Sequence, residues 1–193
     1  MLEDERLEQI LDAAYACFTR HGVRRTTMDD IAREAGISRP AVYQYVRSKD
    51  DAFRRLGARL LEASLSGARA AASVPGTLTE RLTGALEAKL EMTLRLWRDS
   101  PAHAAELLGA DTRLMTELID DYNTAMLGLL VDTVADAGRR TDARAFAELL
   151  LALTRGIEAD LSEPDAPRRR LRQGVTLLVA GLDHTPHQPT ESS

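Results

Sequence analysis

Residues 20–49 carry the start and stop signals of two short helices joined by a tight turn, and no other feature of the chain constrains its fold as strongly. The first helix is predicted over residues 27–35, where a threonine hydroxyl caps its start. Gly36 then supplies the left-handed residue of the turn. Ser38 caps a second helix, which we expect to run to Val46. The segment is therefore predicted to fold as a helical hairpin.

Positive charge stands in this hairpin where a helix disfavours it. Arg39 lies just inside the second helix, and Lys49 lies just inside the helix that follows Ser48. Because a helix N-terminus carries roughly half a positive charge, a cation there is unfavourable by about 0.3–1 kcal/mol. A phosphate group reverses this argument, since helix N-termini and cations both attract phosphate. The hairpin is therefore predicted to contact DNA.

The hairpin and the whole chain carry net charges of opposite sign. The 193 residues have a formal net charge of −5, whereas residues 20–49 contain seven Arg or Lys and three acids, a net charge of +4. A basic face on an acidic body is typical of a protein that binds nucleic acid with one end only.

The remaining composition is that of an ordinary globular protein with one large or two small domains. Cys17 is the sole cysteine, so disulfides within the chain are excluded, which suits a reducing compartment. Its side chain is predicted to be buried. The acidic N-terminus lacks a signal-peptide pattern, and no apolar run approaches membrane-spanning length. We therefore expect a soluble, cytoplasmic protein with no membrane contact.

Apolar residues recur with helical spacing along every long segment, and no segment alternates as a strand does, so the chain is predicted to be all-α. The clearest break is the Ser-Val-Pro-Gly loop at residues 73–76, which a T-x-x-E cap signature follows. We accordingly predict an N-terminal domain at residues 4–64, a second helical domain at 77–183 and a tail at 184–193. The tail is rich in Pro, Thr and Ser and is expected to be disordered. Helices are expected over residues 2–20, 27–35, 38–46, 48–72, 77–98, 101–108, 141–161 and 167–182, and another is expected from residue 111 or 112 to residue 137.

The last two predicted helices are apolar around more than one face. Such helices must be covered on two sides, and no later segment is left to cover them. We therefore expect a second copy of the chain to pack there as a four-helix bundle. Gly156, Gly174 and Gly181 interrupt these helices, either to allow close helix approach or because they are simply tolerated. The residues expected at the dimer interface are Leu149, Leu153, Leu171, Val175, Leu178 and Leu182.

Residues 26–49 read T-T-M-D-D-I-A-R-E-A-G-I-S-R-P-A-V-Y-Q-Y-V-R-S-K. This segment strongly resembles the tetracycline-repressor (TetR) family of bacterial transcription regulators, in its threonine pair, its Ala-Gly turn, Val42-Tyr43 and the Ser48-Lys49 cap. The rest of the chain resembles the family only in the number and length of its helices. The resemblance implies a three-helix helix-turn-helix DNA-binding domain, followed by a helical domain that binds an effector and dimerises. The family often has Phe at the position of Val46, a difference confined to the core.

The resemblance also implies which residues contact DNA. The spacing agrees with it, because Val42 and Val46 must both face the core and therefore turn residues 39, 40, 43 and 44 outward. Carried over by position, the set consists of Arg39, Pro40 and Tyr43 in the major groove with Ala41 beside them, Thr27, Tyr45 and Lys49 on phosphates, Gln44 in either role, and Ser38 at the helix start.

Other site chemistry is not indicated. The four histidines lack the i, i+4 spacing of a helical metal site. The sequence contains no Gly-rich phosphate loop, nucleophile elbow or Cys-His catalytic set. We therefore expect no enzymatic activity, no cofactor and no metal.

An effector site is expected in the middle helices, where the resemblance places the effector cavity. Methionine side chains adapt to varied apolar ligands, while Trp97, His103 and Tyr122 can orient a ligand through polar atoms. The alternative is that these residues are ordinary core. Since no charged anchor is evident, the expected effector is apolar or weakly polar. The candidate residues are Met92, Leu96, Trp97, His103, Leu107, Met115, Leu118, Tyr122 and Met126.

Taken together, the sequence predicts a homodimeric transcription regulator, a repressor that binds a palindromic operator in double-stranded DNA and is released by a small-molecule effector. The rival hypothesis is a helical ligand-binding or enzymatic protein whose N-terminal hairpin contacts other proteins. The two differ in salt dependence, because binding to DNA must weaken steeply as the salt concentration rises.

Overall fold

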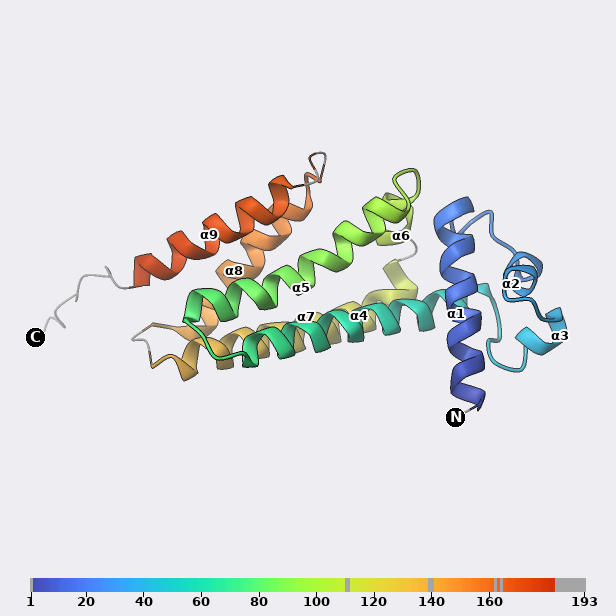
Figure 1. The fold of residues 1–193 in the computed structure, drawn as a ribbon, viewed down its shortest axis with the longest axis horizontal. Coiled ribbons are helices and arrows are strands. Elements are labelled where there is room, and N and C mark those ends of the chain that lie inside the picture. The colour runs from blue at the N-terminus through green and yellow to red at the C-terminus, as the bar shows by residue number, and fades with distance from the viewer. Residues whose placement is uncertain (1, 110–111, 139–140, 162, 164, 183–193) are drawn as a thin grey trace, which may run out of the picture. The chain divides into compact units, whose positions relative to one another are not determined.

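The computed structural model describes residues 2–109, 112–138, 141–161, 163 and 165–182, and within these ranges every regular element is a helix (Figure 1). The all-α prediction is thus confirmed. None of the described helices is long and apolar enough to cross a membrane. The predicted tail lies outside the described residues. The helices are α1 (Leu2–His21), α2 (Met28–Glu34), α3 (Arg39–Val42), α4 (Lys49–Ser73), α5 (Leu78–Asp99), α6 (Ala104–Gly109), α7 (Thr112–Asp136), α8 (Ala143–Glu158) and α9 (Ala166–Leu182).

The chain divides into two compact units. Unit 1 consists of Met1–Ser66 and Glu91–Thr124, and unit 2 consists of Gly67–Leu90 and Ala125–Ser193. Helices α4, α5 and α7 therefore contribute to both units. The predicted domains follow chain order instead, and their boundaries stay a prediction. The difference concerns residues 91–124, which the structure joins to the N-terminal helices.

The core of unit 1 forms where α1, α2 and α3 meet. Ile10, Ala14 and Phe18 lie one above another on the buried face of α1, as expected for apolar residues four apart in a helix. Phe18 meets Phe53 of α4 edge to face, with 5.7 Å between the ring centroids. Cys17 is buried in the same core, and burial raises the pKa of its thiol. Its predicted burial is therefore confirmed.

The turn signals of the hairpin act as predicted. Gly36 has φ +67°, the left-handed conformation that glycine adopts without strain. At the start of α2, the Asp30 N–H donates to Thr27 Oγ1 at 3.2 Å and the Thr27 N–H donates to Asp30 Oδ2 at 3.0 Å, which completes a capping box. The hydrogen bond that the Thr27 hydroxyl donates to Asp30 Oδ2, together with the one from the Thr27 N–H, lowers the pKa of Asp30.

The second hairpin helix is shorter than predicted. The expected helix from Ser38 to Val46 is wrong in its second half, because α3 ends at Val42. Beyond it, the Gln44 N–H donates to the Ala41 carbonyl at 3.2 Å, and the next residue repeats this i→i+3 pattern. Bonds of this kind tighten the last turn and satisfy carbonyl groups that have no partner at a helix end.

In unit 2, α8 and α9 pack side by side (orange and red in Figure 1). Leu150, Leu171 and Val175 are completely buried there. A Cβ atom at Gly174 would lie 2.6 Å from Leu153 Cδ2, so this glycine allows the two helices to approach closely. The close-packing interpretation therefore applies to Gly174. It gains no support at the other two glycines of these helices, where an added Cβ would meet no described atom within 4 Å.

A buried ion pair connects α5 to α8 within unit 2. Lys89 Nζ donates to Glu158 Oε1 at 2.7 Å and to Oε2 at 2.8 Å, and the two side chains are only 9% and 16% exposed. The cost of removing charges from water makes a buried pair weak evidence of net stabilisation. Loss of one partner is different, since the charge that remains is still largely buried but has lost its partner at 2.7–2.8 Å.

Lys89→Ala is therefore expected to lower the free energy of unfolding by about 3–5 kcal/mol. Urea denaturation followed by circular dichroism measures this change. The control is Arg144→Ala, which removes an exposed i, i+4 partner of Glu148 on α8 and should cost no more than about 0.5 kcal/mol. Equal, small losses in both variants would contradict the assignment of Lys89–Glu158 as a buried pair.

Candidate DNA-binding site

The hairpin turns its two valines inward and presents mainly polar side chains on its outer surface. Val42 and Val46 are completely buried, while Tyr43 between them is 42% exposed. Arg39, Pro40 and Gln44 are also exposed. The predicted orientation of the hairpin is thus confirmed. At the start of α3, Ser38 Oγ accepts a hydrogen bond from the Ala41 N–H at 3.3 Å, so Ser38 acts as the predicted cap.

Arg39 is held by two neighbours on this exposed surface. Its Nη1 donates to Asp29 Oδ2 of α2 at 3.0 Å, and its Nη2 donates to Tyr43 Oη at 3.3 Å. The guanidinium carbon also lies 5.6 Å from the centroid of the Tyr43 ring. The bond to Tyr43 and the charge of Asp29 raise the pKa of Arg39. Asp29 was not among the predicted site residues, because a partner ten positions away is fixed by the crossing of the helices and not by local spacing.

The basic side chains of the hairpin fall into two groups. Arg20 pairs with Glu34 at 3.0 Å and Arg33 pairs with Asp30 at 3.2 Å, as Arg39 does with Asp29. Among the residues that the structure describes, no carboxylate forms an ion pair with the other four cations, which together account for the net charge of +4. We call these residues, Arg24, Arg25, Arg47 and Lys49, the unpaired cations.

The predicted phosphate-binding residues have structural partners of their own. Lys49 Nζ donates to the Arg24 carbonyl at 3.1 Å, which leaves two of its three N–H groups for another acceptor. The Thr27 hydroxyl donates to Asp30 Oδ2 at 2.6 Å within the cap. Tyr45 is half-buried and packs against the core of unit 1. Contact of the nine predicted residues with DNA stays a prediction.

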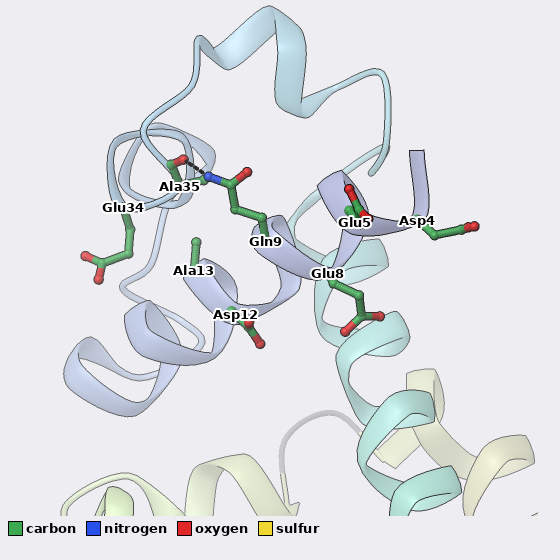
Figure 2. Close-up of a pocket in the computed structure, with 8 residues that line it drawn as sticks. All are labelled: Asp4, Glu5, Glu8, Gln9, Asp12, Ala13, Glu34 and Ala35. Carbon is green, nitrogen blue, oxygen red and sulfur yellow. Dashed lines mark hydrogen bonds between the residues drawn. The ribbon is translucent and has the colours of Figure 1, made fainter. Parts of the chain in front are cut away.

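A groove lined by acidic residues lies on unit 1 between α1 and the end of α2 (Figure 2). Its volume is about 670 Å³. Glu8 and Asp12 on its wall pair with Arg59 at 2.6 and 2.9 Å, and Gln9 Nε2 donates to the Ala35 carbonyl at 2.8 Å. Because carboxylates dominate its lining, the groove repels phosphate and is no part of the candidate DNA-binding surface. Its lining consists of Asp4, Glu5, Glu8, Gln9, Asp12, Ala13, Glu34 and Ala35.

The nine predicted effector residues are divided between the two units, with Met126 in unit 2 and the others in unit 1. Several of them have packing roles. Met115, Leu107 and Leu118 join the core of unit 1, and Tyr122 Oη lies 2.8 Å from Ser64 Oγ. Leu96 and Met126 are buried, whereas Met92, Trp97 and His103 are half-buried. Core packing therefore accounts for several positions, and effector contact stays a prediction.

Polar bonds tie the end of α5 and α6 to the N-terminal helices within unit 1. The Arg24 N–H donates to Glu106 Oε1 at 3.0 Å, and Ser100 Oγ donates to the Thr19 carbonyl at 2.7 Å. The Tyr15 hydroxyl donates to Asp99 Oδ2 at 2.6 Å, and burial together with this carboxylate raises the pKa of Tyr15 to about 12. These partners lie about 80 residues apart in sequence, so no local sequence pattern predicts the contacts.

Known proteins share both the sequence of the hairpin and the fold. Residues 10–56 match the model of the family described as bacterial regulatory proteins, tetR family. YfiR, an HTH-type transcriptional regulator of Bacillus subtilis (strain 168), is 37% identical over 89 residues, which make up 42% of this chain and 43% of YfiR. The chain thus spans less than half the length of this relative.

The described residues contain no group of three or more His, Cys, Asp or Glu side chains that could hold a metal ion.

Two solved structures extend the likeness to the whole fold. A transcriptional regulator from Pseudomonas aeruginosa PAO1 has a TM-score of 0.74 at 24% identity, with 94% of this chain and 91% of that chain covered. SmeT, solved as a complex with triclosan, has a TM-score of 0.69 at 22% identity, with 98% and 99% covered.

The relatives are regulators of transcription and not enzymes, in agreement with the absence of a catalytic motif from the sequence. The family match, the relative and the shared fold agree with the resemblance seen in residues 26–49. Residues 10–56 of this chain thus match the tetR family of bacterial regulatory proteins, and the chain as a whole shares the fold of the two solved structures.

Proposed function

We propose that this chain is a cytoplasmic, ligand-responsive repressor that binds a palindromic operator as a homodimer. The observation that carries the proposal is the exposed Arg39 at the start of α3, on a hairpin with four unpaired cations. Helix starts and cations both attract phosphate, so DNA is the partner that suits this surface. In this arrangement α3 enters the major groove, and the unpaired cations hold the backbone on either side.

The residues of the hairpin divide into base readers and phosphate binders. Arg39 presents a planar fork of donors, which fits the two acceptors on the major-groove edge of guanine. Lys49 carries a compact charge at the start of α4, which suits phosphate but does not read sequence.

Arg39→Ala is expected to flatten sequence preference, since a bidentate contact to guanine gives about 1–3 kcal/mol of discrimination. Lys49→Ala is expected to weaken binding to all duplexes similarly. It should also make the slope of log affinity against log salt concentration shallower by about one. Fluorescence anisotropy with duplexes selected from a randomised pool, at several salt concentrations, measures both effects. Arg98→Ala is the control, because it removes an arginine of α5 that pairs with Glu91 at 3.0 Å. Binding without a steep salt dependence would favour the rival, a hairpin that contacts proteins.

The proposed dimer interface lies on the exposed faces of α8 and α9. Leu149 on α8 is 49% exposed and Leu177 on α9 is 65% exposed. Gly156 and Gly181 lie further along the same faces and leave room for a close neighbour. An exposed leucine beside small residues on each helix suits helix packing across a two-fold axis. Of the six predicted interface residues, Leu171 and Val175 have no exposed surface in the single chain, whereas Leu153, Leu178 and Leu182 are half-buried beside this face.

Leu177→Glu is expected to convert the dimer into a folded monomer, because a buried, unpaired charge is costly at an interface. Size-exclusion chromatography with light scattering measures the mass, and circular dichroism checks the fold. The control is Val74→Glu, which places the same charge at an apolar residue of the loop after α4 that is 59% exposed. A dimer that persists in Leu177→Glu would place the interface elsewhere.

The proposed effector is a small apolar or weakly polar molecule bound among the middle helices. The complex of SmeT with triclosan supports this proposal, since a protein of the same fold holds a small molecule. The connection to DNA is supported by unit 1, in which residues 91–124 pack with the hairpin. In the proposed dimer, the two copies of α3 must lie about 34–36 Å apart to reach both half-sites of the operator. Movement of α5 and α6 would act through Glu106 and Ser100 on the helices that set this distance.

An inducing effector must bind the released form about 5.5 kcal/mol more tightly than the DNA-bound form to shift occupancy from nearly full to nearly empty. Operator DNA must then weaken effector binding by the same factor. Trp97 is the only tryptophan, so its fluorescence reports on the proposed pocket. Titration of triclosan and other small apolar compounds should change this fluorescence, and more compound should be needed when the selected duplex is present. A compound that binds equally well with and without the duplex is not an inducer.

A further inference from the structure

Asp29 is the acidic residue that lies closest to the proposed base-reading group. It occupies the first turn of α2, and its side chain is 56% exposed. Asp30, the next residue, completes the capping box of α2 with Thr27, and these cap bonds do not use the Asp29 carboxylate. That carboxylate instead accepts from Arg39 Nη1 at 3.0 Å. It therefore joins the first hairpin helix to the start of the second through a charged pair.

This contact leaves Arg39 able to read a base. A guanidinium has five N–H donors in one plane. Asp29 takes one donor of Nη1 and Tyr43 takes one of Nη2, at 3.0 and 3.3 Å. One donor on each of these atoms and the Nε–H remain, and two suffice for the acceptors of guanine. The two partners fix the plane of the group, because they hold both of its terminal nitrogens.

A carboxylate on a surface that meets phosphate opposes binding to any DNA sequence. The presence of Asp29 on this surface is therefore explained only if its carboxylate improves the recognition of a particular DNA sequence. A long, flexible arginine that is fixed in advance loses less conformational freedom when it contacts a base. An arginine without this partner is free to turn toward the nearest phosphate and would bind all sequences similarly.

We propose that Asp29 is a positioning residue, which holds Arg39 in the plane in which it reads a base and so sets sequence preference without contacting the base. This inference rests on the proposed DNA-binding function. It predicts that loss of the Asp29 carboxylate affects sequence discrimination and overall affinity differently. Discrimination between sequences should fall, whereas affinity for unrelated DNA should stay the same or rise.

The test compares Asp29→Ala with the intact protein on two duplexes of equal length, one selected from a randomised pool by the intact protein and one scrambled. The ratio of the two affinities is expected to fall about fivefold or more, a part of the discrimination that a bidentate contact provides. Affinity for the scrambled duplex should not decrease. Asp29→Asn keeps the shape and an acceptor oxygen, so it is expected to retain part of the ratio. It also serves as the second variant if Asp29→Ala is unstable.

The matched control is Glu34→Ala, which removes the same charge from the same helix but from a carboxylate that pairs with Arg20. It should raise affinity for both duplexes equally and leave their ratio unchanged. A ratio that stays constant in Asp29→Ala, or that changes equally in Glu34→Ala, would overturn the positioning role. A parallel loss of affinity for both duplexes would also overturn it, since that result indicates that Asp29 only stabilises α2.

Combination with Arg39→Ala separates this inference from the proposed function. In the Arg39→Ala background, removal of the Asp29 carboxylate should have no further effect on the ratio. If Arg39→Ala lowers the ratio and Asp29→Ala does not, the positioning role fails and the proposed function stands. If Arg39→Ala leaves the ratio unchanged, base reading by Arg39 and positioning by Asp29 both fail.

Discussion

The burial of Val42 and Val46 in the core of unit 1 is the interaction on which the candidate site depends. Both side chains are completely buried with those of α1 and α2. Val42 ends α3 and Val46 lies one turn beyond it, so their burial fixes the rotation of this segment and turns Arg39 and Tyr43 toward the outside. A different packing of these two valines would present a different set of side chains. The chemistry of the surface is therefore a consequence of how the core is filled.

Electrostatics then divides the surface of unit 1 into regions with different roles. Three arginines of the hairpin pair with acids, while the unpaired cations keep a net positive charge available. Carboxylates gather in the groove between α1 and the end of α2. Because fields of opposite sign lie on one small unit, a polyanion is guided toward one of its faces and away from another.

Unit 1 contains both the hairpin and most of the proposed effector residues, which gives the fold a physical means to connect DNA binding with effector binding. Residues 91–124 pack with the N-terminal helices, and two hydrogen bonds join them directly, one accepted by Glu106 and one donated by Ser100. Met115 lies in the same core as Phe18 and Phe53. A change at the end of α5 or in α6 therefore acts on groups that already touch the hairpin. Coupling of this kind needs an element with two arrangements, which effector binding would select.

Local signals in the sequence determined much of this protein. The capping box at Thr27, the left-handed Gly36 and the inward valines follow from spacing alone, because these features depend on backbone geometry within a few residues. The effector residues and the dimer interface could be proposed only from family resemblance and apolar pattern. Such patterns mark burial but do not distinguish a ligand or a partner chain from ordinary core.

Tertiary structure alone decided the contacts between distant segments. It showed that α3 ends at Val42, that Asp29 holds Arg39, that Lys89 is buried against Glu158 and that residues 91–124 belong with the hairpin. The last three depend on how helices cross in space. A sequence pattern records which face of a helix is apolar, but the side chain that meets that face is fixed only when the helices have packed.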